Sequence, residues 1–566
     1  MQSSQTRHHA AGFDVRQIGL WRGSSQPRDV QRHEPAKAKA SIGKAVNMAR
    51  ATKILRNFYR DSVSLMQLSS TFAKLPGVEQ ASAIMASANN ISLLKEAGLL
   101  GETIEAGPND LLIALQGQEE ALDAAMAAAE AALNQNPPPV TGNGRSRGMA
   151  PRSIEMGLGN MVGANLVLIS TPGEYAAAEA FKALRLGLNV MLFSDNVELK
   201  DEIALKHFAH DHDLIVMGPD CGTAIINCIP LAFANVVRRG EIGVVAASGT
   251  GLQQVTCLID RWGKGISQAI GTGGHDLHRD VGGISMLQGL KALAADQSTS
   301  VIVLISKPPS PEVAERVLEV AGDAGKPVVV NFLGADPEGI RRPNVFAART
   351  LEDAAAAAVA LADGRRPEED RPERPPFAMP PKLVPGQQYL RGLYSGGTFC
   401  YEASLLLKKN LGQVYSNTPV DPEDRLDDVW TSRGHTVIDL GDDLFTRGRP
   451  HPMIDHRLRN ERILKEAGDP EVAVILLDLV LGYGSHPDPA SEMVPVIQKA
   501  KDLAHKAGRH LVVVGFVCGT SLDPQDLSKQ EAALRDVGVI LAESNAQAVR
   551  LAAAVALGAS GVGRMP

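Results

Sequence analysis

The sequence predicts an α/β protein with several domains, and three observations carry this prediction. A chain of 566 residues is too long for a single domain and is typical of three or four. Most of it alternates short, strongly apolar segments with longer amphipathic ones, the pattern of parallel strands covered by helices on both faces. In addition, one succession of strands and helices occurs twice, in residues 241–365 and again in residues 387–560.

Charge, apolar runs and cysteines argue against several classes of function. The formal net charge of -7 and the lack of a dense basic run disfavour a nucleic-acid partner. The most apolar segment, "VAVILLDLVLGYG", is too short to span a bilayer and contains Asp478, and a secretory signal peptide is absent. The five cysteines have no zinc-like spacing. We therefore expect a cytoplasmic protein with no membrane partner, no disulfide framework and no metal.

The first part of the chain divides into a tail and a small domain. Residues 1–47 have no hydrophobic period, and we expect them to form a disordered extension. Residues 48–135 alternate strands with helices in an order that predicts a ferredoxin-like α+β unit with a regulatory or assembly role. Residues 136–152 include "NPPPVTGNGRSRG" and predict a linker, because proline blocks a helix and glycine loosens the backbone.

Residues 153–240 predict a Rossmann-like domain. The segments "ANLVLIS", "NVMLFS" and "DLIVMGP" are apolar strands, and two helical segments separate them. The last strand leads into a candidate site loop made of Asp220, Cys221 and Gly222. Cys221 invites a nucleophile hypothesis, but no base is fixed beside it in the sequence, so an inert buried thiol is favoured.

The two duplicated stretches predict tandem flavodoxin-like domains. Each begins with a strand and a Ser-Gly turn, "IGVVAASGTG" and "LRGLYSGGTF", and each ends with an Ala-rich helix. Between these ends lie three further matched elements in the same order. Residues 366–386, rich in proline and charge, predict the linker between the two copies.

The duplicated Ser-Gly turns predict a site for an anion. A helix begins with free N–H groups and a partial positive charge of about half a unit. Glycines there let a phosphate or carboxylate approach the backbone, and hydroxyl groups add donors. The alternative is a capped turn without a ligand, but two copies on one scaffold favour a function. The anion-binding residues would be Ser248, Gly249, Thr250, Gly251, Ser395, Gly396, Gly397 and Thr398.

A second pair of loops adds charged side chains at strand ends. "GTGGHDLHRDVGG" supplies Gly273, Gly274, His275, Asp276 and Arg279, and "DLGDDLFTRGRPHP" supplies Asp442, Asp443 and Arg447. His275 could be a general acid–base, an anion-binding donor or a group that only holds its own loop. His275 and Asp276 could bind a metal, but no third ligand is fixed by spacing, so no metal is predicted.

Several of these segments resemble a known superfamily. "VMGPDCGTAIINCIPLAFANVVRRGEIGVVAASGTG" resembles part of the α subunit of succinyl-CoA synthetase. By this resemblance, residues 153–240 are a CoA-binding-type domain and the duplicated domains are paired ligase-CoA domains. From Met48 onward the chain resembles the FdrA family, through "RNFYRDSVSLMQLSS", "AGPNDLL", "STPGEYAAAEAFKAL", "GTGGHDL" and "GLYSGGTFCYEA".

The resemblance implies a reaction, but one feature of the synthetases is missing from this sequence. The synthetases carry phosphate on a loop histidine, whereas the corresponding loops here, "NFLGADPEGIRRPN" and "GFVCGTSLDPQD", contain none, and a Walker-type loop is absent. FdrA-type proteins are similar to a subunit of oxamate carbamoyltransferase, which acts in anaerobic allantoin and purine breakdown. This likeness implies phosphorolysis of oxalurate to oxamate and carbamoyl phosphate, in a complex with two other subunits.

We expect inorganic phosphate to be a substrate held at the paired helix N-termini, with no certain cofactor and CoA binding only implied by the resemblance. His275, Asp276 and Arg279 are the predicted catalytic residues, and Arg279 or Arg447 would neutralise the carboxylate of the substrate. Two alternatives stay open. The chain could be an acyl-CoA synthetase subunit that uses CoA and ATP through a partner, or a non-catalytic assembly scaffold.

Overall fold

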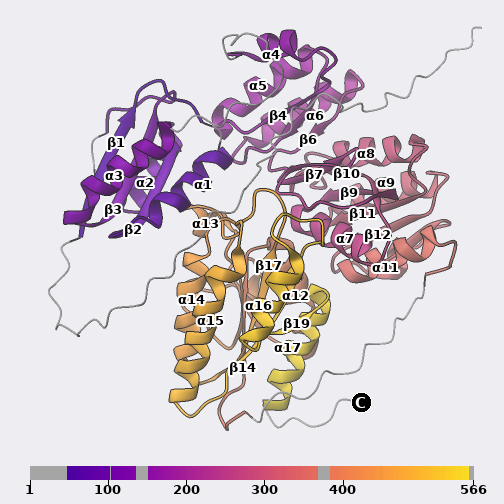
Figure 1. Cartoon of the computed structure of the whole chain (residues 1–566). Coiled ribbons are helices and arrows are strands. Elements are labelled where there is room, and N and C mark those ends of the chain that lie inside the picture. Colours follow the sequence, from indigo (N-terminus) through magenta and orange to yellow (C-terminus); the bar gives the residue numbers. More distant parts are fainter. Residues whose placement is uncertain are drawn as a thin grey trace, which may run out of the picture. The chain divides into compact units, whose positions relative to one another are not determined.

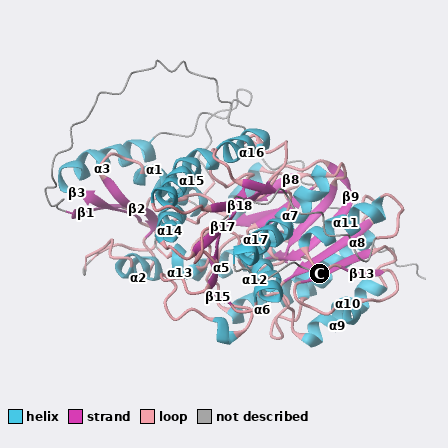
Figure 2. Cartoon of the chain, turned by 90° about the horizontal axis from the view of Figure 1, so that it is seen from below, coloured by secondary structure: helices cyan, strands magenta, loops and turns pink. Residues whose placement is uncertain are grey.

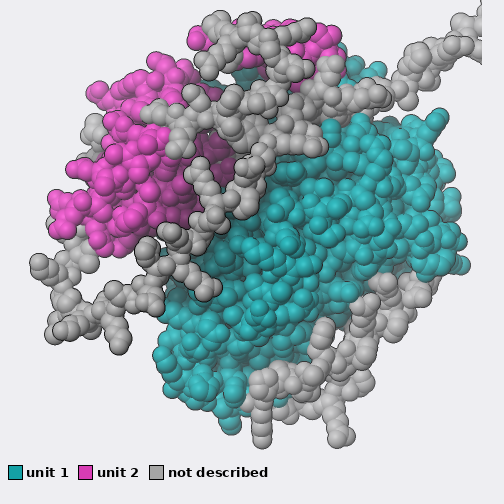
Figure 3. Space-filling model, in the orientation of Figure 1, with its two compact units in different colours: residues 1–13, 61–63, 165–566 teal, residues 14–60, 64–164 magenta. Residues whose placement is uncertain are grey.

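The computed structural model of the chain describes residues 48–60, 62–101, 104–134, 151–367, 383–447 and 449–559. These residues form two compact units, which Figure 3 colours teal and magenta; the larger consists mainly of residues from 165 onward. The predicted extension 1–47, all but two residues of the linker 136–152, and most of the linker 366–386 lie outside the described residues. Among the described helices, none is both long and apolar enough to cross a bilayer.

The smaller unit contains a three-stranded antiparallel sheet in the order β1-β3-β2. Its elements are β1 (Met48–Leu55), α1 (Ser62–Ala73), β2 (Val78–Met85), α2 (Ala88–Glu96), β3 (Leu111–Gln118) and α3 (Glu119–Asn134), and the short helix α4 (Ile154–Asn160) follows. The central strand is buried on both faces, because Leu111 and Ile113 pack on one side and Leu112 on the other. Strand order and directions match the first three strands of a ferredoxin-like fold.

The larger unit begins with a three-stranded parallel sheet in the order β4-β5-β6. Its elements are β4 (Leu166–Ile169), α5 (Gly173–Arg185), β5 (Asn189–Leu192), α6 (Leu199–Asp211) and β6 (Val216–Met217), as the alternating sequence predicts. The expected boundary at residue 240 is too late for this sheet. The hairpin of β7 (Thr223–Ile226) and β8 (Ile229–Ala232) pairs with β10 and so extends the next sheet.

The second sheet of this unit has seven strands in the order β13-β12-β11-β9-β10-β7-β8. Its five parallel strands are β9 (Arg239–Ala247), β10 (Ile266–Gly271), β11 (Val301–Ser306), β12 (Val328–Phe332) and β13 (Val345–Ala347). The helices between and after them are α7 (Gly249–Arg261), α8 (Ile284–Ala295), α9 (Pro311–Gly322), α10 (Pro337–Ile340) and α11 (Leu351–Ala362). Counted along the chain, the strand order is 2-1-3-4-5, the flavodoxin-like order.

The third sheet repeats this arrangement, which confirms the predicted duplication. Its order is β15-β16-β14-β17-β18-β19, and the order 2-1-3-4-5 remains once the edge strand β15 is set aside. The strands are β14 (Tyr389–Tyr394), β15 (Val414–Ser416), β16 (His435–Asp439), β17 (Val472–Val480), β18 (Val512–Cys518) and β19 (Ile540–Ala542). The helices are α12 (Gly397–Leu411), α13 (Asp443–Thr446), α14 (Arg457–Gly468), α15 (Pro489–Lys506), α16 (Leu527–Asp536) and α17 (Asn545–Ala559).

The two flavodoxin-like domains share one hydrophobic core. Leu252 of α7, Leu351 of α11, Phe399 of α12 and Val549 of α17 all belong to the same cluster of fully buried side chains. Helices α8 and α9 cover the other face of the first sheet, and α14 and α15 the other face of the second (Figures 1 and 2). This shared core sets α7 beside α12, the two helices that follow the duplicated turns.

Candidate active site at the paired helix N-termini

The two duplicated turns meet. The Oγ atom of Ser248, before α7, lies 2.7 Å from the Oγ1 atom of Thr398, in the first turn of α12. A Cβ atom built on Gly396 would lie 2.9 Å from Cγ2 of Thr250, so the backbone at the start of α12 also touches the first turn of α7. The sequence predicts two turns that serve one site, and the structure brings them into direct contact.

At the start of α7, the Ser248 side chain caps the helix by accepting a hydrogen bond from the Gly251 N–H, with an N···O distance of 3.1 Å. The N–H groups of Gly249 and Thr250 have no carbonyl partner within their own helix, since the first turn lacks one. Gly249 is exposed to solvent, and a Cβ atom on it would lie 3.4 Å from Oγ1 of Thr223. These two amides therefore stand open to an anion.

At the start of α12, part of the predicted anion site is already filled by the protein. The amide of Ser395 donates to Oδ1 of Asp478 at 2.8 Å, and the amide of Gly396 donates to Oδ2 at 3.0 Å. The hydroxyl of Ser395 donates to the same carboxylate at 2.7 Å. Asp478 in turn pairs with Arg459 at 2.7 Å, and both side chains are fully buried. Ser395 and Gly396 thus hold Asp478, which leaves the first-turn amides of the half-buried Gly397 and the buried Thr398 as the candidate donors here.

A carboxyl group from the neighbouring strand lies against this helix start. Asp439 is the last residue of β16, and its Oδ2 atom lies 2.5 Å from the place where a Cβ on Gly397 would be. Burial raises the pKa of Asp439 to about 6; Lys307 opposes the rise, and Asp442 adds to it. A carboxyl with this pKa exchanges its proton near neutral pH and can either donate to or repel an anion.

The sequence reasoning missed His451, although it lies within the quoted segment "DLGDDLFTRGRPHP". A Cβ atom on Gly441 would lie 2.7 Å from Nε2 of His451, 2.8 Å from the Ser395 carbonyl oxygen and 3.2 Å from Oδ1 of Asp439. The ring packs 6.0 Å from the ring of Phe233. His451 follows the same strand, β16, as the predicted residues Asp442 and Asp443. This shared position is the sequence feature that could have revealed it.

His275 stands on the loop after β10, and a buried ion network holds its ring. Its Nδ1 atom lies 3.4 Å from Oε2 of Glu202, and its side chain is 61% exposed. The hydrogen bond with Glu202 raises the pKa of His275, while burial acts in the opposite direction. Glu202 also pairs with the fully buried Lys206 at 2.8 Å. The position fits a proton donor that faces solvent.

Asp276, predicted to be catalytic, is a buried structural residue. It has no exposed side-chain surface and receives the Lys206 ammonium at 2.8 Å. Its carboxylate also accepts the amides of Ser285 at 3.2 Å and Met286 at 2.8 Å, at the start of α8. These three hydrogen bonds tie helix α6 to α8 and position the loop that carries His275.

Both predicted arginines are exposed at this edge, and the charge of Arg447 acts on Asp443. Arg279 is 76% exposed and forms an ion pair with Glu312. Arg447 is exposed at the end of the short helix α13, where Asp442 is the N-cap residue and accepts from Leu444. The cation that acts on both Asp439 and Asp220 is Lys307, which follows β11. The sequence reasoning did not single out this lysine.

The loop after β6 brings Asp220 to the same edge. A Cβ on Gly273, which has a φ of +86°, would lie 2.2 Å from the Pro219 carbonyl oxygen, so only glycine fits there and the two loops touch. Asp220 keeps some exposure, yet desolvation by the surrounding protein raises its pKa to about 7, and the negative charges of Asp195 and Asp443 add to the rise.

Cys221 is an inert thiol, as favoured from the sequence. It is buried, burial raises its pKa to about 12, and its Sγ atom donates to the Gly271 carbonyl at 3.4 Å. A thiol with this pKa stays protonated at neutral pH and is a poor nucleophile. Its neighbour Gly222 is partly buried, and Gly274 is exposed with open space around its Cα atom.

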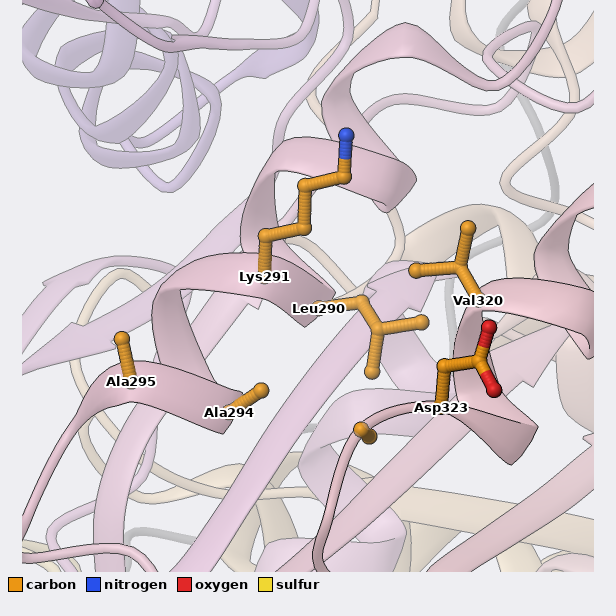
Figure 4. Close-up of a pocket in the computed structure, with 7 residues that line it drawn as sticks. Leu290, Lys291, Ala294, Ala295, Val320 and Asp323 are labelled. Carbon is orange, nitrogen blue, oxygen red and sulfur yellow. The ribbon is translucent and has the colours of Figure 1, made fainter.

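The predicted site residues lie at or after the carboxyl ends of parallel strands, the edge where ligands bind in open α/β folds. In the described part of the chain, no cluster of His, Cys, Asp or Glu is arranged to hold a metal ion. A depression of about 420 Å³ near Leu290, Ala294 and Val320 lies between the last turns of α8 and α9, at the opposite edge of their sheet (Figure 4). It plays no part in this site.

Comparison with known proteins places the chain in a family. Family models described as "AllF, heavy metal-associated domain", "CoA binding domain" and "CoA-ligase" match residues 48–148, 237–334 and 393–555. The chain is 46% identical over 497 residues to the uncharacterised protein YahF of Escherichia coli K12, covering 86% of this chain and 95% of that one. The chain belongs to this FdrA/AllF family. It is a family of succinyl-CoA synthetase-like proteins with CoA-ligase-type domains.

More distant relatives of this FdrA/AllF chain are named as CoA ligases or synthetases. It is 26% identical over 181 residues to the α subunit of the ADP-forming succinate–CoA ligase of Aquifex aeolicus, which covers 30% of this chain and 57% of that subunit. Of solved structures, an acetyl-CoA synthetase from Ca. Korarchaeum cryptofilum covers 70% of this chain and 83% of its own, at 15% identity and a TM-score of 0.30. The CoA binding match falls on the first flavodoxin-like domain, whereas the sequence resemblance gave that description to residues 153–240.

Proposed function

We propose that this FdrA/AllF chain is a subunit of an oxamate carbamoyltransferase that uses inorganic phosphate to split oxalurate into oxamate and carbamoyl phosphate. The observation that best supports this proposal is the 2.7 Å contact between the hydroxyl groups of Ser248 and Thr398, which joins the two helix N-termini. We expect the first-turn amides of both helices to bind one ligand beside this contact. That arrangement suits a tetrahedral oxyanion, because each helix start contributes donors and a partial positive charge.

The reaction needs no phosphorylated enzyme. An oxygen of hydrogen phosphate attacks the carbamoyl carbon of oxalurate and forms the new C–O bond, and the C–N bond to oxamate breaks. The proton of hydrogen phosphate passes to the leaving nitrogen, so atoms and charge balance. The amides of Gly249, Thr250, Gly397 and Thr398 would hold the phosphate, and Lys307, whose charge acts on Asp439 and Asp220, would neutralise the oxalurate carboxylate.

His275 takes the role of proton shuttle in this proposal. The Glu202 carboxylate accepts a hydrogen bond from the ring and raises the pKa of His275, which favours the protonated form that would donate to the leaving nitrogen. Asp276 and Lys206 position its loop through the buried ion network. Binding of CoA and assembly with two other subunits are parts of the proposal that rest on the family resemblance alone.

A second function, acyl-CoA synthesis, is favoured by the CoA-ligase match over residues 393–555. Against it stands the sequence of the loops after β12 and β18, which contain no histidine to carry phosphate from ATP. A ligase built on this chain would need a partner that supplies the nucleotide site.

One experiment separates these functions. The full chain is co-expressed with the products of its neighbouring genes, and the purified complex receives oxalurate and phosphate or, separately, ATP, CoA and a carboxylic acid. Carbamoyl phosphate, detected by ³¹P NMR, is the expected product, and it should vanish when this chain is left out. Thioester formation would favour the ligase, and unchanged turnover by the partners alone would reduce the chain to a scaffold.

A further inference from the structure

We infer that His451 is a catalytic residue whose Nε2–H donates a hydrogen bond to the carbonyl oxygen of the carbamoyl group, at the point where the two helix N-termini meet. The inference deepens the proposed function and rests on it for the identity of the substrate. It concerns a residue that neither the sequence reasoning nor the family resemblance singled out.

The local structure fixes which ring nitrogen carries the proton. His451 stands between two prolines, Pro450 and Pro452, and its carbonyl accepts the Ile454 amide at 2.8 Å, which closes a turn. In that turn the Met453 amide donates to Nδ1 of His451 at 3.2 Å. An amide can donate only to an unprotonated nitrogen, so in the neutral ring the proton lies on Nε2.

The surroundings keep the ring neutral. Burial lowers the pKa of His451 to about 4, and the positive charge of Arg459 acts in the same direction. The acidic group that faces the ring is Asp439, whose own pKa is raised to about 6. At neutral pH the ring is therefore an uncharged donor, and a neutral imidazole can polarise a carbonyl without giving up its proton.

The geometry places the Nε2–H donor of His451 beside the start of α12. Nε2 of His451 and Oδ1 of Asp439 are at most about 6 Å apart, since both lie within 3.2 Å of one point beside Gly441. The other oxygen of Asp439 touches the Gly397 position at the start of α12. The N–H of His451 and the first-turn amide of α12 thus flank a single carboxyl group. In the described part of the chain, Nε2 donates to no other group, so a ligand can receive this hydrogen bond.

His451 assists the step in which negative charge develops on the carbamoyl oxygen. When phosphate attacks, the carbonyl π pair moves onto the carbamoyl oxygen, and a fixed donor stabilises this oxyanion. When the C–N bond breaks, the pair returns and the hydrogen bond weakens. His451 keeps its proton throughout. It cannot act as a nucleophile in this tautomer, because the lone pair of Nδ1 is already taken by Met453.

The test compares three full-chain variants in the complex. His451→Ala removes the donor, and we expect kcat to fall by about 10²–10³-fold with the affinity for sulfate, a phosphate mimic, changed by less than about threefold. Gly441→Ala keeps the histidine but places a Cβ 2.7 Å from Nε2, and an intermediate loss is expected. His505→Ala, on the exposed side of α15, is the matched control and should leave kcat unchanged.

A second measurement does not depend on turnover. In the full chain with ¹⁵N-labelled histidine, NMR should show His451 as the Nε2–H tautomer from pH 5.5 to 8, and sulfate should shift its Nε2 signal. An Nδ1–H tautomer, a titration near pH 6.5, or a His451→Ala kcat within threefold of the unchanged chain would overturn the inference. If the unchanged complex makes no carbamoyl phosphate, the proposed function fails, while the tautomer and the sulfate shift still decide whether His451 is a donor in an anion site.

Discussion

The hydroxyl groups of Ser248 and Thr398 share a 2.7 Å hydrogen bond, although 150 positions separate them along the chain. Each belongs to the first turn or cap of a helix that follows the first strand of a flavodoxin-like domain. The contact therefore joins the corresponding helix starts of the two domain copies. Because the domains also share one buried core, this meeting of helix ends is part of the fold and does not require a ligand to form.

Blocking the open amides of α7 should weaken anion binding without unfolding the protein. Gly249 is exposed and a Cβ atom built on it meets only Thr223 Oγ1, at 3.4 Å, so Gly249→Val should fit and its methyl groups should cover the amides. We expect the dissociation constant for sulfate, measured by calorimetry, to rise at least tenfold. Gly322→Val on α9 has the same chemistry with open space around it and should leave sulfate binding unchanged.

Breaking the buried Asp478–Arg459 pair should destabilise the second domain, because the remaining charge would be buried without a partner charge. Asp478→Asn removes one charge of a fully buried pair and weakens the hold on the Ser395 and Gly396 amides. We expect a loss of about 3 kcal/mol in the free energy of unfolding, measured with urea. Lys182→Ala, which breaks an exposed pair with Glu179, should cost less than about 1 kcal/mol. Equal losses in the two variants would contradict this account.

Anion affinity should fall as the pH rises through the range of 6 to 7. Asp439 and Asp220 have pKa values raised to about 6 and about 7, so both are neutral below that range and negative above it. Sulfate keeps its charge across the range, so its dissociation constant reports the protein alone. We expect tighter binding at pH 5.5 than at pH 8, and Asp220→Asn should flatten the upper part of the curve.

The same raised pKa values also determine whether the stability of the protein rises or falls with pH. The folded state holds these protons more tightly than the unfolded chain, so the stabilising contribution of Asp220 is complete below its ordinary pKa of 3.8 and is lost as the pH rises through about 7. Asp220→Asn should therefore stabilise the protein at pH 8 and have little effect at pH 4. A stabilisation that is equal at both pH values would contradict the raised pKa.

Glu202 should set the proton affinity of His275. Glu202→Gln removes the charge that raises the pKa of His275, so NMR titration should show that pKa falling toward or below 6.5. If His275 shuttles a proton, the basic limb of the pH–rate profile should move to lower pH by the same amount. Glu312→Gln, which removes the partner of Arg279 on the surface, is the control and should leave the titration of His275 in place.

The order of elements could be predicted from the sequence because parallel strands buried on both faces are almost wholly apolar. β11 (Val301–Ser306) and β17 (Val472–Val480) are examples, and both are buried along their whole length. The boundary near residue 240 was wrong because the β7–β8 hairpin is as apolar as a Rossmann strand. Only its pairing with β10, through Ala269 and Ile225, shows which sheet it extends.

The edge that carries the site could also be predicted, but the partners of individual side chains could not. Asp276 and His275 are neighbours in a loop, yet one is sealed against Lys206 and the other faces solvent. Ser395 precedes a glycine, as Ser248 does, yet a buried aspartate from β17 accepts its amide. Such outcomes depend on packing between residues far apart in the sequence, and the spacing of residues along the chain does not show it.

Crystals of the full chain soaked in tungstate test the central claim most directly, because tungsten scatters anomalously and the ion has the shape and charge of a tetrahedral oxyanion. We predict one strong peak whose oxygens lie about 3 Å from the amide nitrogens of Gly249 and Gly397. A peak held by only one of the two helices, or density elsewhere with this junction closed by side chains, would contradict the account.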